Sequence, residues 1–449
     1  MKYVRFLLIF AIVLAALGLY QQPAKAGAFT YTSSINLQNL SNSVAHITVH
    51  FYLQDGTEDP LSPVVTTIDA LGSKVFFPIP TSAGFSGSVV IESDVQIASI
   101  SNILGNSGVA AASYVGSSNG GSPVLLPLLM KGNSGYNTWF NVQNAGGGDA
   151  TVTVTYSDGV TASGTIKPGA SKTFDQTLEA HTVKVFSAKV ESNQPIAATV
   201  IEENTGIMFA YSGFISTSTN PVIPLVNANN AGYVTGISIQ NSGGVDTSVT
   251  VSYTPSGPGA GTACTETQTI PDGESKVFAL LAFAGAPGTT TNCVANAKFV
   301  GSGKVTANST GQPLTAIVNQ LKIGVNGEAY GAFDASVATG TVVLPLIMNA
   351  NGGYWTSINL MNVGAAETTV TCTFTPFPGV TLPVPVRTLA PNAGVSLLQA
   401  AGDEFGPTTK YVGSATCTAP GGQIIAVVNE VGPSSTADQL LVYEGFNIP

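Results

Sequence analysis

Hydrophobic and polar positions alternate along most of the chain, and the same alternation recurs in four copies. The segment His46-Ile47-Thr48-Val49-His50-Phe51 carries an apolar residue at every second position without a break. A period of two is the signature of a β-strand with one buried face. We therefore expect strands joined by turns over nearly the whole chain.

The four copies share one register, which can be counted from an asparagine. The asparagines are Asn39, Asn144, Asn241 and Asn362. A tyrosine stands eight residues before each of them, at Tyr31, Tyr136, Tyr233 and Tyr354. Apolar residues stand two and four residues before the asparagine and eight, ten and twelve residues after it. Because these spacings are even, we expect the apolar residues and the tyrosines to pack in a core, with the asparagine in a turn.

Glycine, proline and small polar residues mark the turns between the expected strands. Gly146-Gly147-Gly148-Asp149 follows the second asparagine, and Pro168-Gly169-Ala170-Ser171-Lys172 is a turn with counterparts in the other copies. The last three copies also begin with an apolar run around a proline, which suits an opening edge strand; these prolines are Pro127, Pro224 and Pro345. Each copy closes on a tyrosine, at Tyr114, Tyr211, Tyr330 or Tyr443. The span from one closing tyrosine to the next suits one sandwich of seven or eight strands.

The repeated copies resemble the Ig-like modules of bacterial exported and cell-surface proteins. The resemblance rests on an aliphatic strand with a glycine-rich turn after it, a Val-x-Val-x-Tyr strand and a Pro-Gly-x-Ser turn. These modules include the cell-adhesion-related domain found in bacteria. The resemblance covers nearly all of residues 27 to 449 and implies Ig-like sandwiches with a surface or extracellular role. It carries no functional residue onto this chain.

We therefore expect an all-β protein of four tandem Ig-like (immunoglobulin/fibronectin-type) antiparallel β-sandwich domains after a cleaved signal peptide. The expected domains are residues 27–120, 121–218, 219–338 and 339–449, the third with an insertion bracketed by cysteines. Short polar joints predict that the domains stack end to end. Four sandwiches in line would reach on the order of 120 Å.

Residues 1–26 have the pattern of a secretory signal peptide. Two basic residues precede an apolar run from Phe6 to Tyr20, and small residues flank Lys25. We expect this segment to be removed and the mature protein to be exported, to the extracellular space, the cell surface or the periplasm. No later apolar run approaches the roughly 18 residues needed to cross a bilayer.

The charge balance narrows the expected partners. Charged residues make up 9% of the chain, with 25 acidic against 15 basic residues, and Arg387 is the single arginine after residue 26. So little positive charge offers no counterion-releasing surface for phosphates, which argues against nucleic acid and anionic lipid. We expect partners among copies of the protein itself or other cell-envelope components, either protein or polysaccharide.

Four cysteines lie in the last two copies, at Cys264, Cys293, Cys372 and Cys417. An even number in an exported chain favours disulfides within each copy. Cys372 and Cys417 take apolar core positions on different strands, whereas the other two cysteines bracket the insertion. We predict the pairs 264–293 and 372–417, with free thiols or metal ligands as the alternative.

No other residues have the spacing of a catalytic or metal site. His46 and His50 share one face of a strand but lack the further ligands that zinc requires. His181 has neither a nucleophile elbow nor a cysteine partner. The acidic turn that contains Asp55, Glu58 and Asp59 misses the EF-hand spacing, so a solvated hairpin tip is the preferred interpretation and calcium the alternative.

Two acidic pairs and one tryptophan complete the candidates. Glu202-Glu203 and Asp403-Glu404 are adjacent in sequence, so on a strand each pair would point to opposite faces, unlike a glycosidase pair. Trp139 is out of register with the core positions and is the candidate ligand contact. We expect no catalytic residue, cofactor or metal.

The sequence favours an exported, non-catalytic structural or adhesive cell-surface protein that associates with protein or glycan. One alternative is a subunit of an extracellular filament or surface layer, because uncharged strand edges invite pairing with another chain. A second alternative is a carbohydrate-binding accessory module of a secreted enzyme system.

Overall fold

The computed structural model describes residues 27–280, 283, 285–309, 311–375, 379–402, 404–433 and 437–448. The predicted signal peptide, residues 1–26, lies outside the described residues. Within these ranges the protein is all-β, with antiparallel strands and one short 3-10 turn, η1 (Ala335–Val337). No helix of the described part is long and apolar enough to cross a membrane.

Four successive stretches of the chain each form an inner and an outer sheet, and we name the four sheet pairs the first to fourth sandwich. The first contains β1 (Tyr31–Asn39), β2 (Ala45–Leu53), β3 (Val64–Ile68), β4 (Ser73–Phe76), β5 (Gly87–Ser93), β6 (Ile97–Gly105) and β7 (Ala110–Val115). The second contains β8 (Val124–Asn133), β9 (Tyr136–Asn144), β10 (Ala150–Tyr156), β11 (Thr161–Ile166), β12 (Ser171–Asp175), β13 (Val185–Ser192), β14 (Ile196–Glu203) and β15 (Met208–Ser212).

The third sandwich contains β16 (Pro221–Ala228), β17 (Tyr233–Asn241), β18 (Thr247–Pro255), β19 (Cys264–Ile270), β20 (Ser275–Phe278), β21 (Thr290–Thr291), β22 (Phe299–Ala307), β23 (Leu314–Lys322), β24 (Asn326–Gly331) and β25 (Phe333–Asp334). The fourth contains β26 (Thr341–Asn349), β27 (Trp355–Asn362), β28 (Thr368–Phe374), β29 (Val386–Leu389), β30 (Gly394–Leu398), β31 (Tyr411–Thr418), β32 (Ile424–Val431), β33 (Leu440–Glu444) and β34 (Phe446–Ile448).

Corresponding strands take the same places in all four sandwiches. The inner sheets have the orders β4-β1-β6-β7, β12-β9-β14-β15, β20-β17-β23-β24 and β30-β27-β32-β33. The outer sheets are β3-β2-β5, β11-β10-β13-β8, β21-β19-β18-β22-β16-β25 and β29-β28-β31-β26-β34. In the second sandwich β8 also pairs with β9 and so joins the two layers.

The alternating residues form the core between the two sheets, as the pattern predicted. In β10 the residues Val152, Val154 and Tyr156 are buried and the threonines between them are exposed. The counterparts in the other sandwiches are also buried: Ile47, Val49, Phe51, Val249, Val251, Tyr253, Val370, Cys372 and Phe374. Alternation thus buries one face of each strand, where apolar area contributes most to stability.

The shared asparagine caps the turn that follows its strand. In the second sandwich Asn144 is fully buried, and its Nδ2 donates to Gly148 O (2.7 Å) and Ile166 O (2.9 Å). Its Oδ1 accepts from Gly146 N at 2.8 Å. Asn39, Asn241 and Asn362 make the same kinds of bond with their own loops.

We expect Asn144→Ala to lower the free energy of unfolding by about 2 kcal/mol, because it leaves buried backbone groups without partners. Urea unfolding followed by circular dichroism measures the change. Asn119→Ala is the matched control, since Asn119 is exposed and should change stability by less than about 0.5 kcal/mol. Equal effects of the two substitutions would contradict the capping role.

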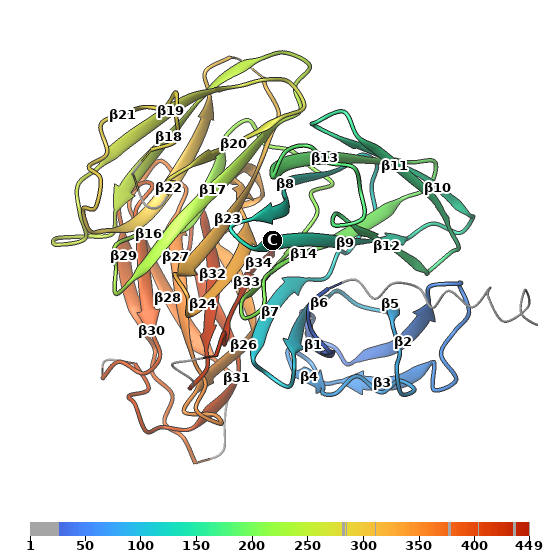
Figure 1. Cartoon of the computed structure of the whole chain (residues 1–449). Coiled ribbons are helices and arrows are strands. Elements are labelled where there is room, and N and C mark those ends of the chain that lie inside the picture. Colours follow the sequence, from blue (N-terminus) through green and yellow to red (C-terminus); the bar gives the residue numbers. More distant parts are fainter. Residues whose placement is uncertain are drawn as a thin grey trace, which may run out of the picture.

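The four sandwiches close into a ring, so the sequence-based expectation of a line was wrong (Figure 1). The closing strands β7, β15, β24 and β33 are the last strands of the four inner sheets. Strand β7 packs against β15 and β33, and β24 packs against the same two strands. Four sheet edges therefore meet at one central axis.

Buried carboxyl groups bind the backbone N–H groups of these converging edges. Asp438 accepts from Met208 N (2.8 Å) and Gly327 N (3.0 Å), so it connects the second and third sandwiches to the fourth. Glu328 accepts from Ala210 N at 3.0 Å, one step further along the axis. Because unpaired strand edges are costly when buried, these bonds explain why a ring is stable here.

A repeated serine connects the sandwiches farther from the axis. Ser88 Oγ donates to Gly169 O of the second sandwich at 2.6 Å, and Ser187 Oγ donates to Gly273 O of the third at 3.0 Å. Ser302 Oγ likewise donates to the carbonyl oxygen of Asn392 in the fourth. Each acceptor lies in the shared turn that the sequence indicated, so this turn joins neighbouring sandwiches.

Candidate binding cleft

The first sandwich differs from the other three at its opening strand. Strands β8, β16 and β26, which we name the opening strands, pair with β13, β22 and β31 of their own outer sheets. Each also packs against the inner sheet of the next sandwich around the ring. In the first sandwich the strand that corresponds to β13, β22 and β31 is β5. No strand of the described residues pairs with the second edge of β5, so the place of an opening strand is empty there.

Side chains beside this edge are less buried than their counterparts. Ile91 of β5 is half-buried, whereas the residues at the same register position, Val190, Val305 and Cys417, are fully buried. Val89 is also half-buried, and its counterpart Ala188 is 1% exposed. Part of the first core therefore faces a cleft instead of an opening strand.

The closing tyrosine shows the same difference. In the second sandwich Tyr211 Oη donates to Leu128 O of the opening strand at 2.7 Å and accepts from Leu128 N at 3.3 Å. Tyr330 and Tyr443 clamp their opening strands in the same way. Tyr114, the fourth of these tyrosines, is half-buried and lines the cleft beside Ser101.

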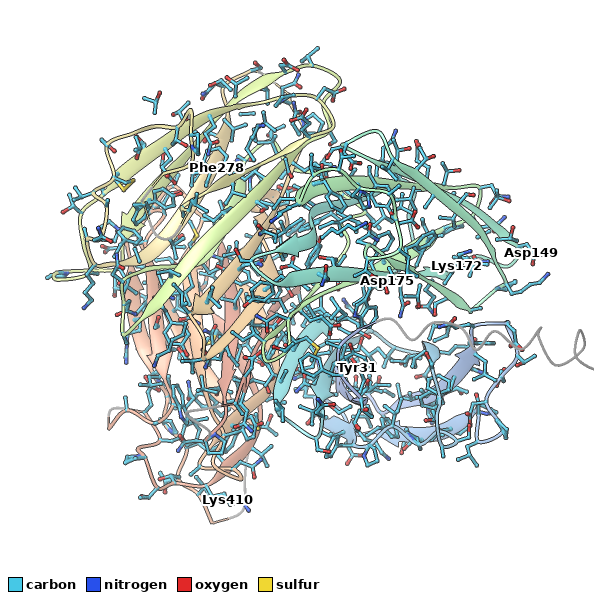
Figure 2. The ribbon with its side chains drawn as sticks, in the orientation of Figure 1. Tyr31, Asp149, Lys172, Asp175, Phe278 and Lys410 are labelled. Atoms are coloured by element: carbon cyan, nitrogen blue, oxygen red, sulfur yellow. A yellow bond between two sulfur atoms is a disulfide. The ribbon has the colours of Figure 1, made fainter. Side chains whose placement is uncertain are left out.

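The cleft lies mainly between the first and second sandwiches, with residues of the other two, such as Phe333 and Phe446, also in its lining, and it has a volume of about 2420 Å³. Near the axis, Tyr31 Oη donates to Glu203 Oε2 at 2.7 Å and closes one end; Figure 2 shows Tyr31 on the side of the first sandwich that faces the second. At the periphery, Gln143 Nε2 donates to Val89 O at 3.1 Å. The space is too large for an ordinary small-molecule pocket, which suits a segment of a polymer.

The two walls of the cleft differ in polarity. The first sandwich contributes half-buried apolar side chains, among them Phe85, Val89 and Ile91. The second contributes hydroxyl and amide groups, among them Asn141 and Thr199. Of the described residues that line the cleft, Asp55 alone is charged, so any ligand bound there meets a nearly neutral surface. All other acidic, basic and histidine side chains of the described part lie outside this lining.

Trp139, the candidate ligand contact, lies on the wall of this cleft. It is half-buried, packs edge-on against Tyr31 with ring centroids 5.6 Å apart, and its Nε1 donates to Glu203 Oε1 at 3.3 Å. Burial raises the pKa of Glu203, and the hydrogen bonds from Tyr31 and Ala28 oppose this rise. Trp139, which the sequence singled out because it falls between the core positions of its strand, therefore lies at the cleft and is hydrogen-bonded to Glu203.

The sequence did not reveal the cluster of buried acids around the axis. Burial raises the pKa of Glu202, Glu430 and Asp438 to about 8 and that of Glu444 to about 7. It also holds the pKa of Glu328 well above its usual range. These groups come from distant segments of the chain. The sequence gives one indication of them, which is that Glu202 and Glu430 are acidic residues at the same position of the repeat in two sandwiches.

The adjacent acidic pairs behave as predicted where they can be seen. Glu202 Oε2 accepts from Asn319 of the third sandwich at 2.7 Å, whereas Glu203 binds Tyr31 of the first, so the two point in opposite directions. Glu404 Oε1 accepts from Arg387 Nη2 at 2.9 Å. Asp403, its neighbour, lies outside the described residues.

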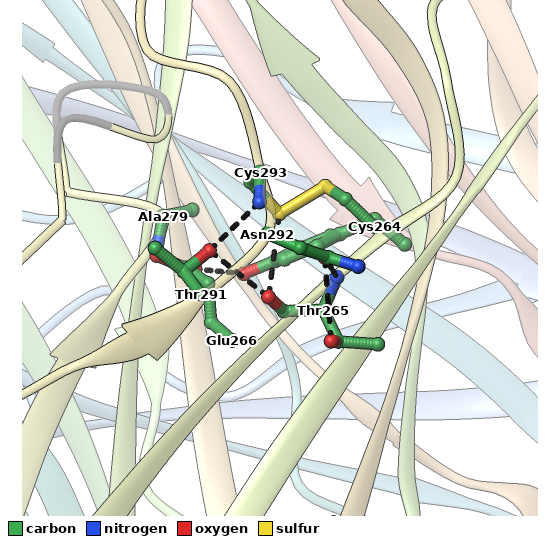
Figure 3. The surroundings of a disulfide bond; sticks show 8 residues. Cys264, Thr265, Glu266, Ala279, Thr291, Asn292 and Cys293 are labelled. Carbon is green, nitrogen blue, oxygen red and sulfur yellow. Dashed lines mark hydrogen bonds between the residues drawn. A yellow bond between two sulfur atoms is a disulfide. The ribbon is translucent and has the colours of Figure 1, made fainter.

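Both predicted disulfides are present. Cys264 is bonded to Cys293, and Cys372 to Cys417. The second bond joins directly opposite residues of β28 and β31 within the core. The first lies at the surface, where Thr265 and Asn292 are hydrogen-bonded beside it (Figure 3). Disulfides indicate an oxidising, extracellular-type environment.

The histidines each bind a carboxylate. His46 Nδ1 lies 2.7 Å from Asp94 Oδ2, and His50 Nδ1 lies 3.2 Å from Glu58 Oε1. The His181 side chain is fully buried between Asp158 (2.9 Å) and Gln176 (3.0 Å), so both of its ring nitrogens are engaged. Across the described ranges, no three His, Cys, Asp or Glu residues are grouped as metal ligands would be.

The acidic turn is only partly a solvated hairpin tip. Asp55 is exposed and accepts from Thr57, but Asp59 is 1% exposed. Its carboxylate accepts from Leu61 N and Ser82 N, and these bonds, together with Ser82 Oγ, keep the pKa of Asp59 below its usual value against the effect of burial. Asp59 therefore fastens the loop that follows β4, which the sequence did not indicate.

Comparison with known proteins places the chain in no family. No family model matches it, and the comparison with curated proteins returns no match. The crystal structure of Thermotoga maritima 1070 is 21% identical and aligns over 21% of this chain and 95% of its own, with a TM-score of 0.19. A structure concerned with the triple jelly roll fold and turret assembly in an archaeal virus is 11% identical over 91% of this chain and 92% of its own, with a TM-score of 0.14. Both scores are too low to support an argument about fold or function.

Proposed function

We propose that the mature chain is an exported, non-catalytic structural or adhesive protein of the cell surface. In this proposal four Ig-like β-sandwich domains, with the boundaries expected from the sequence, form one scaffold that acts by binding protein or glycan. The observation that supports it is the cleft between the first and second sandwiches, where an unpaired strand edge lies beside a nearly neutral lining.

We expect the purified chain from Gly27 to bind cell-envelope material in a way that depends little on salt. Only Asp55 of the cleft lining is charged, so apolar contact and hydrogen bonds must carry the affinity. Sedimentation with whole cells, peptidoglycan and isolated envelope proteins at about 0.05 to 0.5 M salt measures this. Binding that disappears at moderate salt would contradict the proposed interaction.

The same preparation tests the non-catalytic part of the proposal. Incubation with glycans and peptides should leave the substrates unchanged. Turnover that survives repurification and is lost in His181→Gln or in Glu203→Gln would overturn it.

A carbohydrate-binding module is the second candidate, and a specific observation favours it. Trp139 and Tyr31 form an aromatic corner beside the hydroxyl and amide groups of Asn141 and Thr199. Aromatic faces next to neutral hydrogen-bonding groups suit sugar rings. A Trp139→Ala variant that loses binding to polysaccharide, while keeping its fold, would favour this candidate over protein binding.

A further inference from the structure

We propose that the cleft receives an extended, uncharged, apolar strand from another polypeptide, which pairs with β5 and completes the first sandwich. This inference rests on the proposed function, since it names the partner class and the binding mode of the same cleft. It corresponds to β-strand addition, in which main-chain hydrogen bonds provide affinity and alternate side chains provide specificity.

The other three sandwiches show what occupies the equivalent place. In the second sandwich Val124 of the opening strand pairs with Val190, and Leu126 pairs with Ala188. Strand β8 also packs against β17 and β23 of the next sandwich. Its first seven residues are all buried. The opening strand is therefore covered on both faces, by its own core and by the neighbouring sandwich.

The chemistry of the missing strand follows from these sister strands. They read Val124-Leu125-Leu126-Pro127-Leu128, Val222-Ile223-Pro224-Leu225 and Val342-Val343-Leu344-Pro345-Leu346, without a charged residue. In each strand, the backbone N–H and C=O of the residue after the proline are hydrogen-bonded to the hydroxyl group of the closing tyrosine. In the first sandwich Tyr114 holds the matching place on the cleft wall. A donor strand thus finds an apolar face, a free strand edge and a tyrosine for its backbone.

The second wall of the cleft gives the donor one distinguishing feature. Three sandwiches place an aliphatic residue against the opening strand of their neighbour, at Ile100, Ile317 and Val427, each at most 1% exposed. At the same register position the second sandwich has Thr199, which is half-buried. The face of the donor that meets Thr199 and Asn141 therefore tolerates hydroxyl or amide side chains, while its other face is apolar.

Within the described residues the three apolar opening strands already pair in their own sheets, so none of them is left over for the cleft. By sequence position, the residues before Gly27 that would match Leu126 and Met130 are Gln21 and Lys25. The matched sites are buried, and a buried lysine without a partner is costly. A second copy is also unsuitable, because its three apolar opening strands are already built into its own sheets. A strand from a different polypeptide is the remaining occupant.

A synthetic peptide with the sequence of residues 122–131 tests the proposal as a stand-in for the donor. The protein has two tryptophans, Trp139 and Trp355, so the Trp355→Phe chain from Gly27 reports from the cleft alone. We expect a saturable change in tryptophan fluorescence and a rise in the melting temperature of the protein. The same peptide with Leu126→Asp should bind at least tenfold more weakly, since it would bury a charge.

Matched variants locate the binding site. Tyr114→Phe should weaken peptide binding at least about fivefold, because it removes the hydroxyl that would bond the peptide backbone, whereas Tyr211→Phe should leave peptide affinity unchanged, because Tyr211 clamps its own β8. Ile91→Asp should abolish binding, and Val65→Asp on the opposite edge strand should not. Thr199→Lys on the second wall provides a variant that leaves the first core intact.

Each other outcome overturns the proposal in a recognisable way. No binding by the folded chain, or binding that Tyr114→Phe and Thr199→Lys leave unchanged, excludes the cleft as a strand acceptor. A chain starting at Leu19 that no longer binds the peptide would assign the cleft to the protein's own preceding residues. Dimers that the peptide dissociates would assign it to a second copy. Envelope binding that persists when the cleft is saturated with peptide or blocked by Thr199→Lys would refute this site but not the proposed function.

Discussion

Raising the pH from about 4.5 to about 8 is expected to destabilise the folded protein progressively. Burial raises the pKa of Glu202, Glu430 and Asp438 to about 8, and that of Glu444 to about 7, from ordinary values of 4.5 for glutamate and 3.8 for aspartate. In this range the unfolded chain ionises these groups while the fold keeps them protonated, so unfolding releases protons. The stability that they contribute is complete below the unfolded pKa and is lost as the pH rises through the folded pKa.

The expected slope is as much as about 1.4 kcal/mol per pH unit for each such group. Urea unfolding at intervals between pH 5 and pH 8.5 measures it. Carboxylates with lowered pKa, such as Asp59 and Asp94, act in the opposite sense only near and below their ordinary pKa and leave this window unaffected. A flat stability profile would contradict the burial of protonated acids at the axis.

The third sandwich has a neutral side chain at the position of two of these carboxyl groups, which favours their being protonated in the fold. At the register position of Glu202 and Glu430 the third sandwich has Gln320, whose Oε1 accepts from Asn429 Nδ2 at 3.1 Å. Glu202 accepts from Asn319 in the same manner. A carboxamide has the shape of a protonated carboxyl group, so one position holds both kinds of side chain.

The Glu202→Gln/Glu430→Gln variant should therefore match the native protein near pH 5 and exceed it near pH 8 by at least about 2 kcal/mol. Its stability should also fall less steeply with pH. Glu191→Gln is the control, because Glu191 is exposed and paired with Lys189. Lower stability of the double variant at both pH values would show that the two glutamates are ionised in the fold.

Removing the Cys372–Cys417 disulfide is expected to lower the free energy of unfolding by about 2 to 5 kcal/mol. Both cysteines are at most 1% exposed and lie among the core residues of the fourth sandwich. The Cys372→Ala/Cys417→Ala variant loses the covalent constraint on the unfolded chain and also packing volume in the core. Urea unfolding near pH 5 measures the loss.

The surface disulfide provides the matched comparison. Cys264 and Cys293 are half-buried, and the hydrogen bond from Thr265 N to Asn292 Oδ1 (2.7 Å) beside them involves neither sulfur atom. Cys264→Ala/Cys293→Ala should therefore cost less, because it removes the constraint without opening a cavity in the core. An equal or larger loss would show that packing around Cys372 contributes little.

Much of the local structure could be predicted from the sequence because its causes are local. Strict alternation in segments such as β10 assigned strands and their buried faces, and the same register placed Cys372 opposite Cys417. Asn144 is the last residue of β9 and not part of the turn itself, but its side chain caps the loop that follows, because a short amide readily bonds its own loop. The even parity of these positions is a property of any strand with one buried face.

The candidate site was only partly foreseen. Trp139 was selected because it is out of register with the core positions, and it does line the cleft. The register gave no information about which segment lies opposite Trp139. One sequence signal for the cleft was present: the proline run at Pro127, Pro224 and Pro345 occurs in three copies and not in the first. Its absence has a structural meaning only once the opening strands are seen to lie between sandwiches.

The sequence by itself determined the all-β class, the strand register, the capped turns and the disulfide pairing, because each depends on residues within one copy. The tertiary structure alone decided that the four sandwiches close into a ring and leave a cleft between the first and the second. That outcome depends on outward-facing groups from distant segments, such as Asp438 on the backbone of Met208 and Ser88 on the carbonyl of Gly169. Outward-facing positions follow no period that marks their partners, so such contacts are not readable before the fold brings the segments together.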